Sequence, residues 1–405
     1  MRIASFAQPK RRVFQETTEG RKHRPDYVLL VLMCALLLCG AIVVYAIGPG
    51  LTSGTKLSSN YYSSKQLVAI ILGFIGFGVA VMTPIRKWIR FQPIIIGLAI
   101  IAAFAVRIVG DEINGAHRWI HLGGMSFQVA ELIKLALVLG LARYLSERKK
   151  QGLMKDASTF KHLGILIVSI VAIVAGMQSD LGSAAVMMAI VGVLSFVAGL
   201  PMQKLLIGGG VLVILVAFAI LLTPYRRDRV ATFFNPTADC KTEGYQACQA
   251  LITVGSGGLI GKGVGHSVQA YGYLPEPAND SIFAVVSEKF GFVGAAVMVG
   301  VFWLIFRRLL VIIRSTPDEY TAFIVMGVLV WLSVQMTINI GAMIGLLPLK
   351  GITLPFVSYG GTSIIFVMFA MGLVFQASKY TDLSLAKARR VQVNAFEPPR
   401  RLKRV

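Results

Sequence analysis

Long runs of apolar residues recur along almost the whole chain, separated by shorter polar segments. A helix needs about 20 consecutive, mostly apolar residues to cross a bilayer, and many of these runs approach that length. The pattern predicts ten transmembrane helices, at roughly residues 27–48, 66–83, 91–109, 127–146, 161–178, 181–199, 204–223, 290–307, 320–345 and 353–377. Two short spans meet near residues 178–183, and the longest stretch between spans covers residues 224–289.

The composition excludes an ordinary soluble protein. The 405 residues are 56% hydrophobic and only 15% charged, with a mean hydropathy of +0.72, whereas a soluble domain carries about 25% charged residues. We therefore expect an all-α polytopic membrane protein. Its expected parts are a basic tail (1–26), a ten-helix membrane domain (27–377) with a large extracytoplasmic loop (224–289), and a second basic tail (378–405).

The distribution of lysine and arginine predicts the orientation. Both tails are rich in these residues, and so are the segments "RKWIR" near Arg86 and "RYLSERKKQ" near Arg143. With both termini in the cytoplasm, most basic residues lie inside, as the positive-inside rule and an even number of spans require. The net charge of +21 then indicates contact with anionic lipid and not with nucleic acid, because the sequence has no basic soluble domain.

Two features of the outer loop suggest chemistry but leave alternatives open. The segment "GSGGLIGKGVG" (255–265) contains Lys262 but departs from the phosphate-binding pattern of nucleotide-binding loops, so it is either a backbone cradle for phosphate or a close packing site. Cys240 and Cys248 flank a short segment, and an oxidising exterior would allow these two cysteines to form a disulfide. Two free thiols are the alternative.

Charged residues inside the spans are a stronger signal, because charge is costly within a bilayer. Glu131 and Lys134 lie one helical turn apart, so they form either a structural ion pair or the lining of a polar cavity. Asp180 is either a helix cap or part of that cavity. His117 and His121 have no acidic partner of the kind found in zinc peptidases, and we predict no metal site.

Asp280 lies where the outer loop meets an apolar run, in "YLPEPANDSIFAVVSEKFG" (273–291). Two prolines prevent a helix before it, and the residues after it are expected to be helical or buried. At that boundary the carboxylate would lose part of its hydration, which raises the pKa and improves it as a proton acceptor near neutral pH. A helix-capping role is the alternative. Glu276 lies in the looser, proline-flanked part.

Six segments in order resemble the SEDS family (shape, elongation, division and sporulation) of membrane glycosyltransferases over most of residues 27–377. They are "NGAHRWIHLGGMSFQVAELIK", "QSDLGSAAV", "YRRDRVATFFNP", "GYQACQALITVGSGGLIGKGVG", "YLPEPANDSIFAVVSEKFG" and "INIGAMIGLLPLKGITLPFVSYGGTS". The segment around Lys350 and Thr353 is closer to the FtsW division branch than to the RodA elongation branch. The family usually has proline near Gln178–Asp180, where this chain has Ser179.

The resemblance implies that the protein polymerises lipid II into glycan strands during cell division. In this reaction a sugar hydroxyl attacks the anomeric carbon of the donor, configuration inverts and a pyrophosphate-linked lipid leaves. By resemblance Asp280 is the essential acid, most simply the general base. The candidate substrate-binding residues are Arg118, Lys134, Glu131, Arg226, Arg227, Arg229, Lys262 and Glu276. No cofactor is required; a divalent cation between Asp280 and the pyrophosphate is compatible with the sequence, but no ligand cluster demands it.

The resemblance also implies partners and a location. The partners are a class B penicillin-binding protein, which is a transpeptidase, and other membrane proteins of the division complex. The location is the bacterial cytoplasmic membrane at the division septum. Two alternative functions stay open at this point: a lipid II flippase, for which ten spans and an intramembrane charged pair would be suitable, and a non-catalytic division scaffold.

Overall fold

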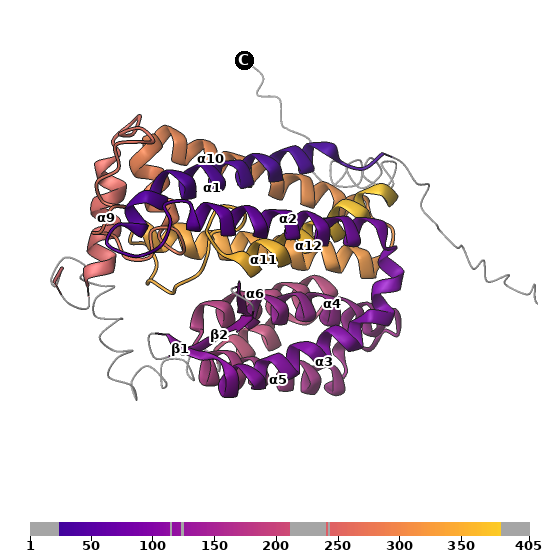
Figure 1. Ribbon diagram of the computed structural model, residues 1–405. Coiled ribbons are helices and arrows are strands. Elements are labelled where there is room, and N and C mark those ends of the chain that lie inside the picture. Colours follow the sequence, from indigo (N-terminus) through magenta and orange to yellow (C-terminus); the bar gives the residue numbers. More distant parts are fainter. Residues whose placement is uncertain (1–23, 114–115, 123–124, 211–239, 242–243, 382–405) are drawn as a thin grey trace, which may run out of the picture.

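The structure is a computed structural model that describes residues 24–113, 116–122, 125–210, 240–241 and 244–381. Its long helices run roughly side by side in two groups (Figure 1). The first group contains α1 (Tyr27–Thr52), α2 (Tyr61–Met82), α10 (Ile282–Ser315), α11 (Glu319–Met343) and α12 (Gly361–Ala377). The second contains α3 (Ile85–Val109), α4 (Val129–Lys150), α5 (Ala157–Ile170), the π-helix η2 (Val171–Met177) and α6 (Leu181–Ala198).

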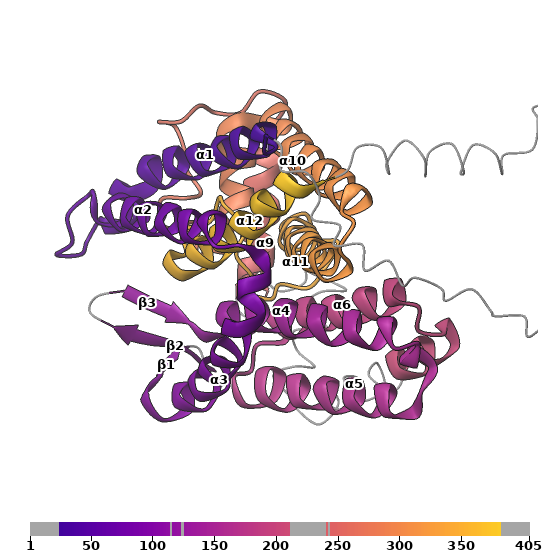
Figure 2. The ribbon, with the colours of Figure 1, turned by 90° about the vertical axis from the view of Figure 1, so that its right-hand side faces the viewer.

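Shorter elements gather at one end of the two groups, as the view turned by 90° also shows (Figure 2). They are α9 (Tyr245–Ser256) and a three-stranded antiparallel sheet of β1 (Asp111–Ile113), β2 (Ala116–Leu122) and β3 (Met125–Gln128). Single 3₁₀ turns, η1 (Leu153–Lys155) and η3 (Ser378–Tyr380), follow α4 and α12. The described chain therefore has one end built from helix termini and another built from loops, strands and α9.

Among the described residues, eight helices are long and apolar enough to cross a membrane. The expectation of an all-α polytopic membrane protein is confirmed. The helix α4 is not one of the eight, although it is 22 residues long. It carries charged residues at both ends and is packed inside the protein, so its neighbours rather than lipid surround it.

Several predicted boundaries differ from the structure. The predicted span 290–307 begins at Ile282, and the predicted span 353–377 begins only at Gly361, because residues 353–360 form a loop. The predicted span 204–223 is helical as far as Gly210, and its remainder lies outside the described residues. Both basic tails lie almost wholly outside them too. The strands between α3 and α4 were not predicted.

Aspartate side chains cap the starts of four of the spans. Asp26, Asp156, Asp180 and Asp318 precede α1, α5, α6 and α11, and each accepts a hydrogen bond from a backbone N–H of the first helical turn. Such caps satisfy donors that have no partner within the helix. Of the two interpretations of Asp180, the capping one is what the structure shows, with Oδ1 2.9 Å from the Ser183 nitrogen.

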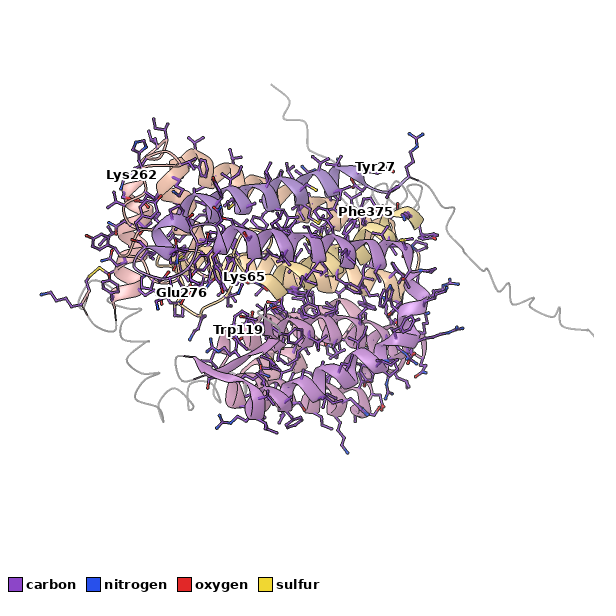
Figure 3. The ribbon with its side chains drawn as sticks, in the orientation of Figure 1. Tyr27, Lys65, Trp119, Lys262, Glu276 and Phe375 are labelled. Atoms are coloured by element: carbon purple, nitrogen blue, oxygen red, sulfur yellow. A yellow bond between two sulfur atoms is a disulfide. The ribbon has the colours of Figure 1, made fainter. Side chains whose placement is uncertain are left out.

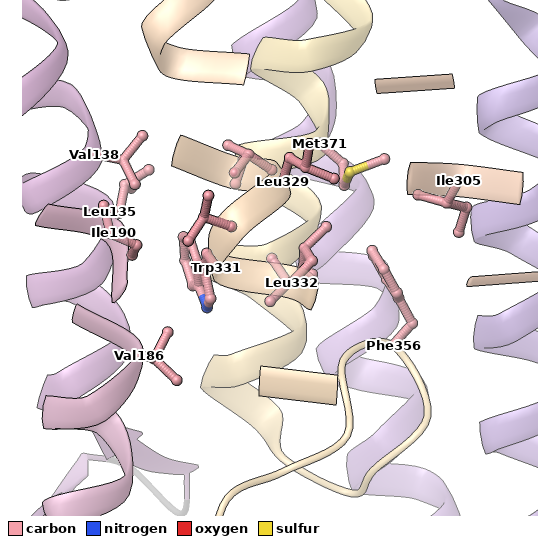
Figure 4. Close-up of a cluster of buried hydrophobic side chains, with 14 of the residues drawn as sticks. Leu135, Val138, Val186, Ile190, Ile305, Leu329, Trp331, Leu332, Phe356 and Met371 are labelled. Atoms are coloured by element: carbon pink, nitrogen blue, oxygen red, sulfur yellow. The ribbon is translucent and has the colours of Figure 1, made fainter. Parts of the chain in front are cut away.

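The two helix groups meet around Trp331, which is completely buried on α11 (Figure 4). Leu135 and Val138 of α4 and Ile190 of α6 belong to the same buried cluster. Close approach elsewhere depends on small residues, as is common between membrane helices. A Cβ on Gly372 of α12, for example, would lie 2.7 Å from the Phe77 carbonyl oxygen of α2. This packing gives the loops at the far end a rigid base.

Candidate active site

Asp280 lies in a tight turn directly before α10, outside the membrane-spanning segments. The Ser281 hydroxyl donates to the Pro275 carbonyl at 2.9 Å, and the Ser281 nitrogen donates to the Glu276 carbonyl at 3.2 Å. Glu276 itself has a φ of 47°, in the left-handed region that closes such turns. The prolines that prevent a helix and these bonds together fix the backbone of Asp280.

The loop between α11 and α12 holds this turn from the other side. The Asn339 side-chain amide donates to the carbonyl oxygens of both Asp280 and Ile352, each at 2.7 Å. The Ser358 hydroxyl donates to the Asn279 carbonyl at 2.6 Å, and the Tyr359 nitrogen to the Ala278 carbonyl at 2.8 Å. Segments far apart in sequence thus form one rigid unit around the aspartate.

The carboxyl group of Asp280 is weakly paired for its degree of burial. Its Oδ1 is buried without a hydrogen-bond partner among the described residues, and Oδ2 accepts only a long bond of 3.4 Å from Gln246 of α9. Burial, reinforced by the negative charge of Glu276, raises the pKa of Asp280 to about 7. A carboxylate with this pKa is suited to accept a proton near neutral pH.

Arg118 of β2 is held beside the aspartate by backbone carbonyls. Its Nη2 donates to the Ser179 carbonyl at 2.5 Å and its Nε to the Gln178 carbonyl at 3.3 Å. Ser179 has a φ of 52°, which proline cannot adopt, so this turn requires a residue other than proline here. The guanidinium keeps its Nη1 for another partner.

Arg118 and Asp280 face the same small space at Gly351. A Cβ added to Gly351 would lie 3.7 Å from Arg118 Nη1 and 3.7 Å from Asp280 Oδ2. Gly351 is exposed and has a φ of 61°, a conformation that favours glycine. A hydrogen-bond donor and a proton acceptor therefore approach the same exposed glycine, whose missing side chain leaves open the space beside both groups, termed the gap.

Glu131 and Lys134 do not line this gap. Both are almost fully buried, and Lys134 Nζ lies 2.7 Å from Glu131 Oε1 and 2.8 Å from Gln335 Oε1. The Gln335 amide nitrogen donates to the Thr353 carbonyl at 3.0 Å, two residues beyond Gly351. The ion pair thus supports the loop that carries Gly351, and in this conformation neither charge reaches the gap itself.

The glycine-rich segment is a packing site around a break in α10. At Gly291 the backbone leaves the helical conformation (φ 67°, ψ −167°). A Cβ on Gly261 would lie 2.2 Å from the Lys289 carbonyl oxygen, and the Gly263 nitrogen donates to that oxygen. Lys262 forms an ion pair of 3.2 Å with the buried Glu288. Of the two interpretations, close packing is therefore the one observed.

Other predicted residues have separate positions. Glu276 is exposed and accepts a hydrogen bond from the Asn279 side chain, and it lies at the same end of the bundle as Lys262 and Trp119 (Figure 3). Cys240 and Cys248 form a disulfide with an S–S distance of 2.04 Å. Arg226, Arg227 and Arg229 lie outside the described residues. No group of three or more metal-ligating side chains occurs among the described residues.

Sequence reasoning did not include Gln246, Asn339 or Gly351 among the site residues. One signal was available for Asn339: it follows Gln335 by four residues in an otherwise apolar span, so both amides lie on one helix face. Polar residues in such a position usually have a specific partner. Nothing in the local sequence indicates that Gln246 or Gly351 approaches Asp280.

These features define a polytopic α-helical membrane protein with a partly buried acidic site at one end of its bundle. The chain belongs to the cell cycle protein family named for FtsW, RodA and SpoVE, whose family model matches residues 27–383. It is 32% identical to a probable peptidoglycan glycosyltransferase FtsW from Saccharophagus degradans, over 88% of this chain and 92% of that one. It is 34% identical to stage V sporulation protein E from Bacillus subtilis, over 89% and 99%.

Solved structures show the same fold. A chain in a structure described as "Structural coordination of polymerization and crosslinking by a peptidoglycan synthase complex" superposes with a TM-score of 0.72 at 29% identity, covering 87% of this chain and 97% of that one. The crystal structure of the rod shape determining protein RodA from Thermus thermophilus gives a TM-score of 0.64 at 27% identity, covering 87% and 96%.

Proposed function

We propose that this protein is a peptidoglycan glycosyltransferase that polymerises lipid II, with Asp280 as general base. The observation that carries the proposal is that a partly buried carboxylate and an anchored guanidinium both approach the exposed Gly351. The names of the relatives support the same reaction, because several are probable peptidoglycan glycosyltransferases.

The proposed step is a displacement at the anomeric carbon of the donor sugar. A hydroxyl oxygen of the acceptor forms the new C–O bond while the bond to the pyrophosphate oxygen breaks, which inverts the configuration. Asp280 takes the hydroxyl proton, and the lipid pyrophosphate leaves with the bonding electron pair. Arg118 Nη1 offsets the negative charge that develops on the leaving group. No nucleotide is needed, because the donor is already activated; a divalent cation at the pyrophosphate stays a prediction.

The candidate substrate-binding residues differ in how directly they would act on the substrate. Arg118 faces the gap directly, and Glu276 raises the proton affinity of Asp280 through its charge. Lys134 and Glu131 act in this proposal through the Gln335 contact with the loop of Gly351, and Lys262 acts through the packing of the break in α10. Arg226 and Arg229 stay predicted pyrophosphate partners.

The proposed location is the bacterial cytoplasmic membrane at the division septum, with Asp280 on the outer side and both termini in the cytoplasm. The bundle end opposite Asp280 contains the basic start of α3 and the basic end of α4, which agrees with the positive-inside rule. The proposed partners are a class B penicillin-binding protein, other division proteins and anionic lipid. The superposed synthase complex, described as coordinating polymerisation with crosslinking, supports the first of these.

The test is polymer formation from labelled lipid II by the purified chain, alone and with its penicillin-binding partner. We expect polymer from the parent protein and none from Asp280→Asn. Asp156→Asn is the matched control, because Asp156 is an exposed helix cap at the opposite, basic end and asparagine also caps helices. Leaflet exchange of lipid II in vesicles without polymer would favour the flippase, and neither activity in the complex would favour the scaffold.

A further inference from the structure

A cavity of about 500 Å³ lies between α3, α4, α5 and η2, in the helix group that does not contain Asp280. Small residues create it: Ala99 and Ala103 of α3 and Ala136 of α4 line it, and each is nearly fully buried. Most other lining residues are aliphatic. The volume is in the range of ligand-binding pockets, which span about 300–1,000 Å³, and the proposed transfer reaction does not use this cavity.

Two polar atoms in the cavity lining have no partner among the described residues. Gln92 is only 7% exposed, and its Oε1 is buried without a hydrogen bond. The hydroxyl of Tyr144 is buried and unpaired as well. An unsatisfied polar group inside a membrane protein is costly, because neither water nor lipid tails can bond to it there. A ligand with both hydrogen-bond donors and acceptors would remove this cost.

Three of the four polar lining residues lie near one end of the bundle. Gln92, Tyr144 and His162 are each within about two turns of the end of α3, α4 or α5. His162 is exposed and lines the cavity, so the cavity opens there. The deeper lining residues, such as Ala103 and Val174, are apolar apart from Ser169 of α5. The cavity is therefore mostly polar near its mouth and mostly apolar in its interior, which matches the order of groups in a lipid.

The helix ends at the mouth carry an excess of positive charge. The exposed basic residues there are Arg86, Lys87, Arg90, Lys149, Lys150 and Lys161. The acidic residues at the same level are Glu147, which pairs with Arg143, Asp156, which caps α5, Asp318, which caps α11, and Glu319, which pairs with Lys149. Basic residues near a membrane surface attract anionic lipid. The surroundings of the mouth thus favour a negatively charged headgroup.

We propose that this cavity binds one molecule of an anionic phospholipid, phosphatidylglycerol, with one acyl chain in the apolar interior. Tyr144 Oη donates to an ester carbonyl, and the Gln92 amide accepts from a glycerol hydroxyl of the headgroup. Phosphatidylcholine with the same acyl chains has neither the net negative charge nor these hydroxyl groups, so it binds more weakly. The bound lipid fills the space between α3, α4 and α5 and stabilises their packing.

The first test counts retained lipid by native mass spectrometry of the full chain, purified in detergent, delipidated and incubated with either phospholipid. We expect one phosphatidylglycerol to be retained, with an apparent affinity at least about tenfold above that for phosphatidylcholine. Ala99→Phe fills the cavity and abolishes retention. Leu98→Phe is the control, because Leu98 is 54% exposed on the same helix and does not line the cavity. Equal retention by both variants, or equal affinity for both lipids, overturns the proposal.

A second test does not depend on the folding of Ala99→Phe. Phosphatidylglycerol with a photoreactive acyl chain should label peptides of α3, α4 and α5 in the parent protein, and labelling confined to other helices overturns the proposal. Gln92→Leu should lose most of the thermal stabilisation that added phosphatidylglycerol gives. Gln66→Leu should keep it, because Gln66 is also a buried and unpaired glutamine but lies on α2. An equal loss in both variants contradicts the cavity as the site.

Discussion

Asn339 of α11 binds the carbonyl oxygens of Asp280 and Ile352 with one amide group, at 2.7 Å each. Ile352 follows Gly351, so this single side chain fixes the distance between the aspartate and the gap beside it. Because α11 packs against helices of both groups and its Trp331 is fully buried, the amide has a rigid base. Asn339 is therefore a positioning residue for the proposed reaction.

Replacement of Asn339 by leucine should slow polymerisation strongly. The substitution keeps the size of the side chain but leaves two buried carbonyl oxygens unpaired, at a cost of about 1–3 kcal/mol each. Relaxation of the two loops should lower kcat by about tenfold or more with a smaller change in KM. The assay is the initial rate of polymer formation from lipid II.

Thr337→Val is the control for this variant. Thr337 lies on the same helix, and its hydroxyl donates only to the Ser333 carbonyl within α11. We expect this variant to keep the parent rate. A parent-like kcat in Asn339→Leu would show that the two loops hold their positions without the amide, and Asn339 would then have no positioning role.

The membrane architecture follows from the sequence because the bilayer imposes a simple length and polarity rule on each span. The prediction of a span over residues 353–377 was wrong at its start, because residues 353–360 form a loop. The loop residues are apolar enough to extend the last span, but the Tyr359 nitrogen and the Ser358 hydroxyl donate to the turn of Asp280 instead of continuing α12. Local hydrophobicity does not report such a partner, which comes from a segment some 80 residues away.

The site residues also divide into those that the sequence reveals and those that depend on partners from distant segments. Asp280 and Arg118 were identifiable because both occur in the motifs of the family, and Asp280 also lies where the outer loop meets an apolar run. Gly351 was not, because its role depends on two side chains from other segments that meet beside it. The glycine-rich segment had two interpretations, and only the break in α10 at Gly291 distinguishes them. Because of this break, the amide groups of Lys262 and Gly263 bond to carbonyl oxygens of α10.

The pH dependence of polymerisation should show an acid limb controlled by Asp280. A general base acts only when deprotonated, and the pKa of Asp280 is raised to about 7 by burial and by Glu276. The rate should therefore rise between about pH 6 and 8, by close to tenfold for each unit below the pKa. Glu276→Gln should move this limb to lower pH, because one negative neighbour is removed. A rate independent of pH over this range would contradict the assignment of Asp280 as general base.

Asp280→Asn should make the protein inactive and at the same time more stable. In the folded chain the pKa of Asp280 is about 7, against an ordinary value of 3.8. Between these values the folded form binds a proton that the unfolded form has released, so the stability contributed by this group is lost as pH rises through the window. At pH 8 the neutral asparagine avoids that loss, which is worth roughly 2–4 kcal/mol.

The measurement for this prediction is thermal unfolding of both proteins in detergent at pH 5 and pH 8. The variant should unfold at a higher temperature than the parent at pH 8, and the difference should shrink at pH 5. Asp156→Asn provides the comparison, because the exposed Asp156 has a pKa below its ordinary value owing to hydrogen bonds from Ser158. An Asp280→Asn protein less stable than the parent at pH 8 would show that the carboxylate is stabilised in the fold.

Arg118→Lys should weaken the reaction although it conserves the charge. The guanidinium uses Nε and Nη2 on two backbone carbonyls and still presents Nη1 to the gap. A single ammonium group cannot match this fork. We expect kcat to fall by about 10–100-fold. Arg107→Lys, an exposed residue in the last turn of α3, should keep the parent rate. Full activity in Arg118→Lys would place the guanidinium outside the mechanism.

Gly291→Ala should destabilise the protein, whereas Gly300→Ala, the same substitution further along α10, should not. Gly291 has a φ of 67°, and a Cβ there would lie 2.4 Å from the Gly261 nitrogen and from the Leu259 carbonyl oxygen. Neither backbone atom is free to move, so the strain of about 1–2 kcal/mol from the left-handed conformation is increased by a steric overlap.

Gly300→Ala is the matched control, because no atom lies within 4 Å of its Cβ position in the helix. It should raise stability by about 0.5–1 kcal/mol. Thermal unfolding in detergent distinguishes the two, and a Gly291→Ala protein as stable as Gly300→Ala would show that the glycine-rich segment does not constrain the break in α10.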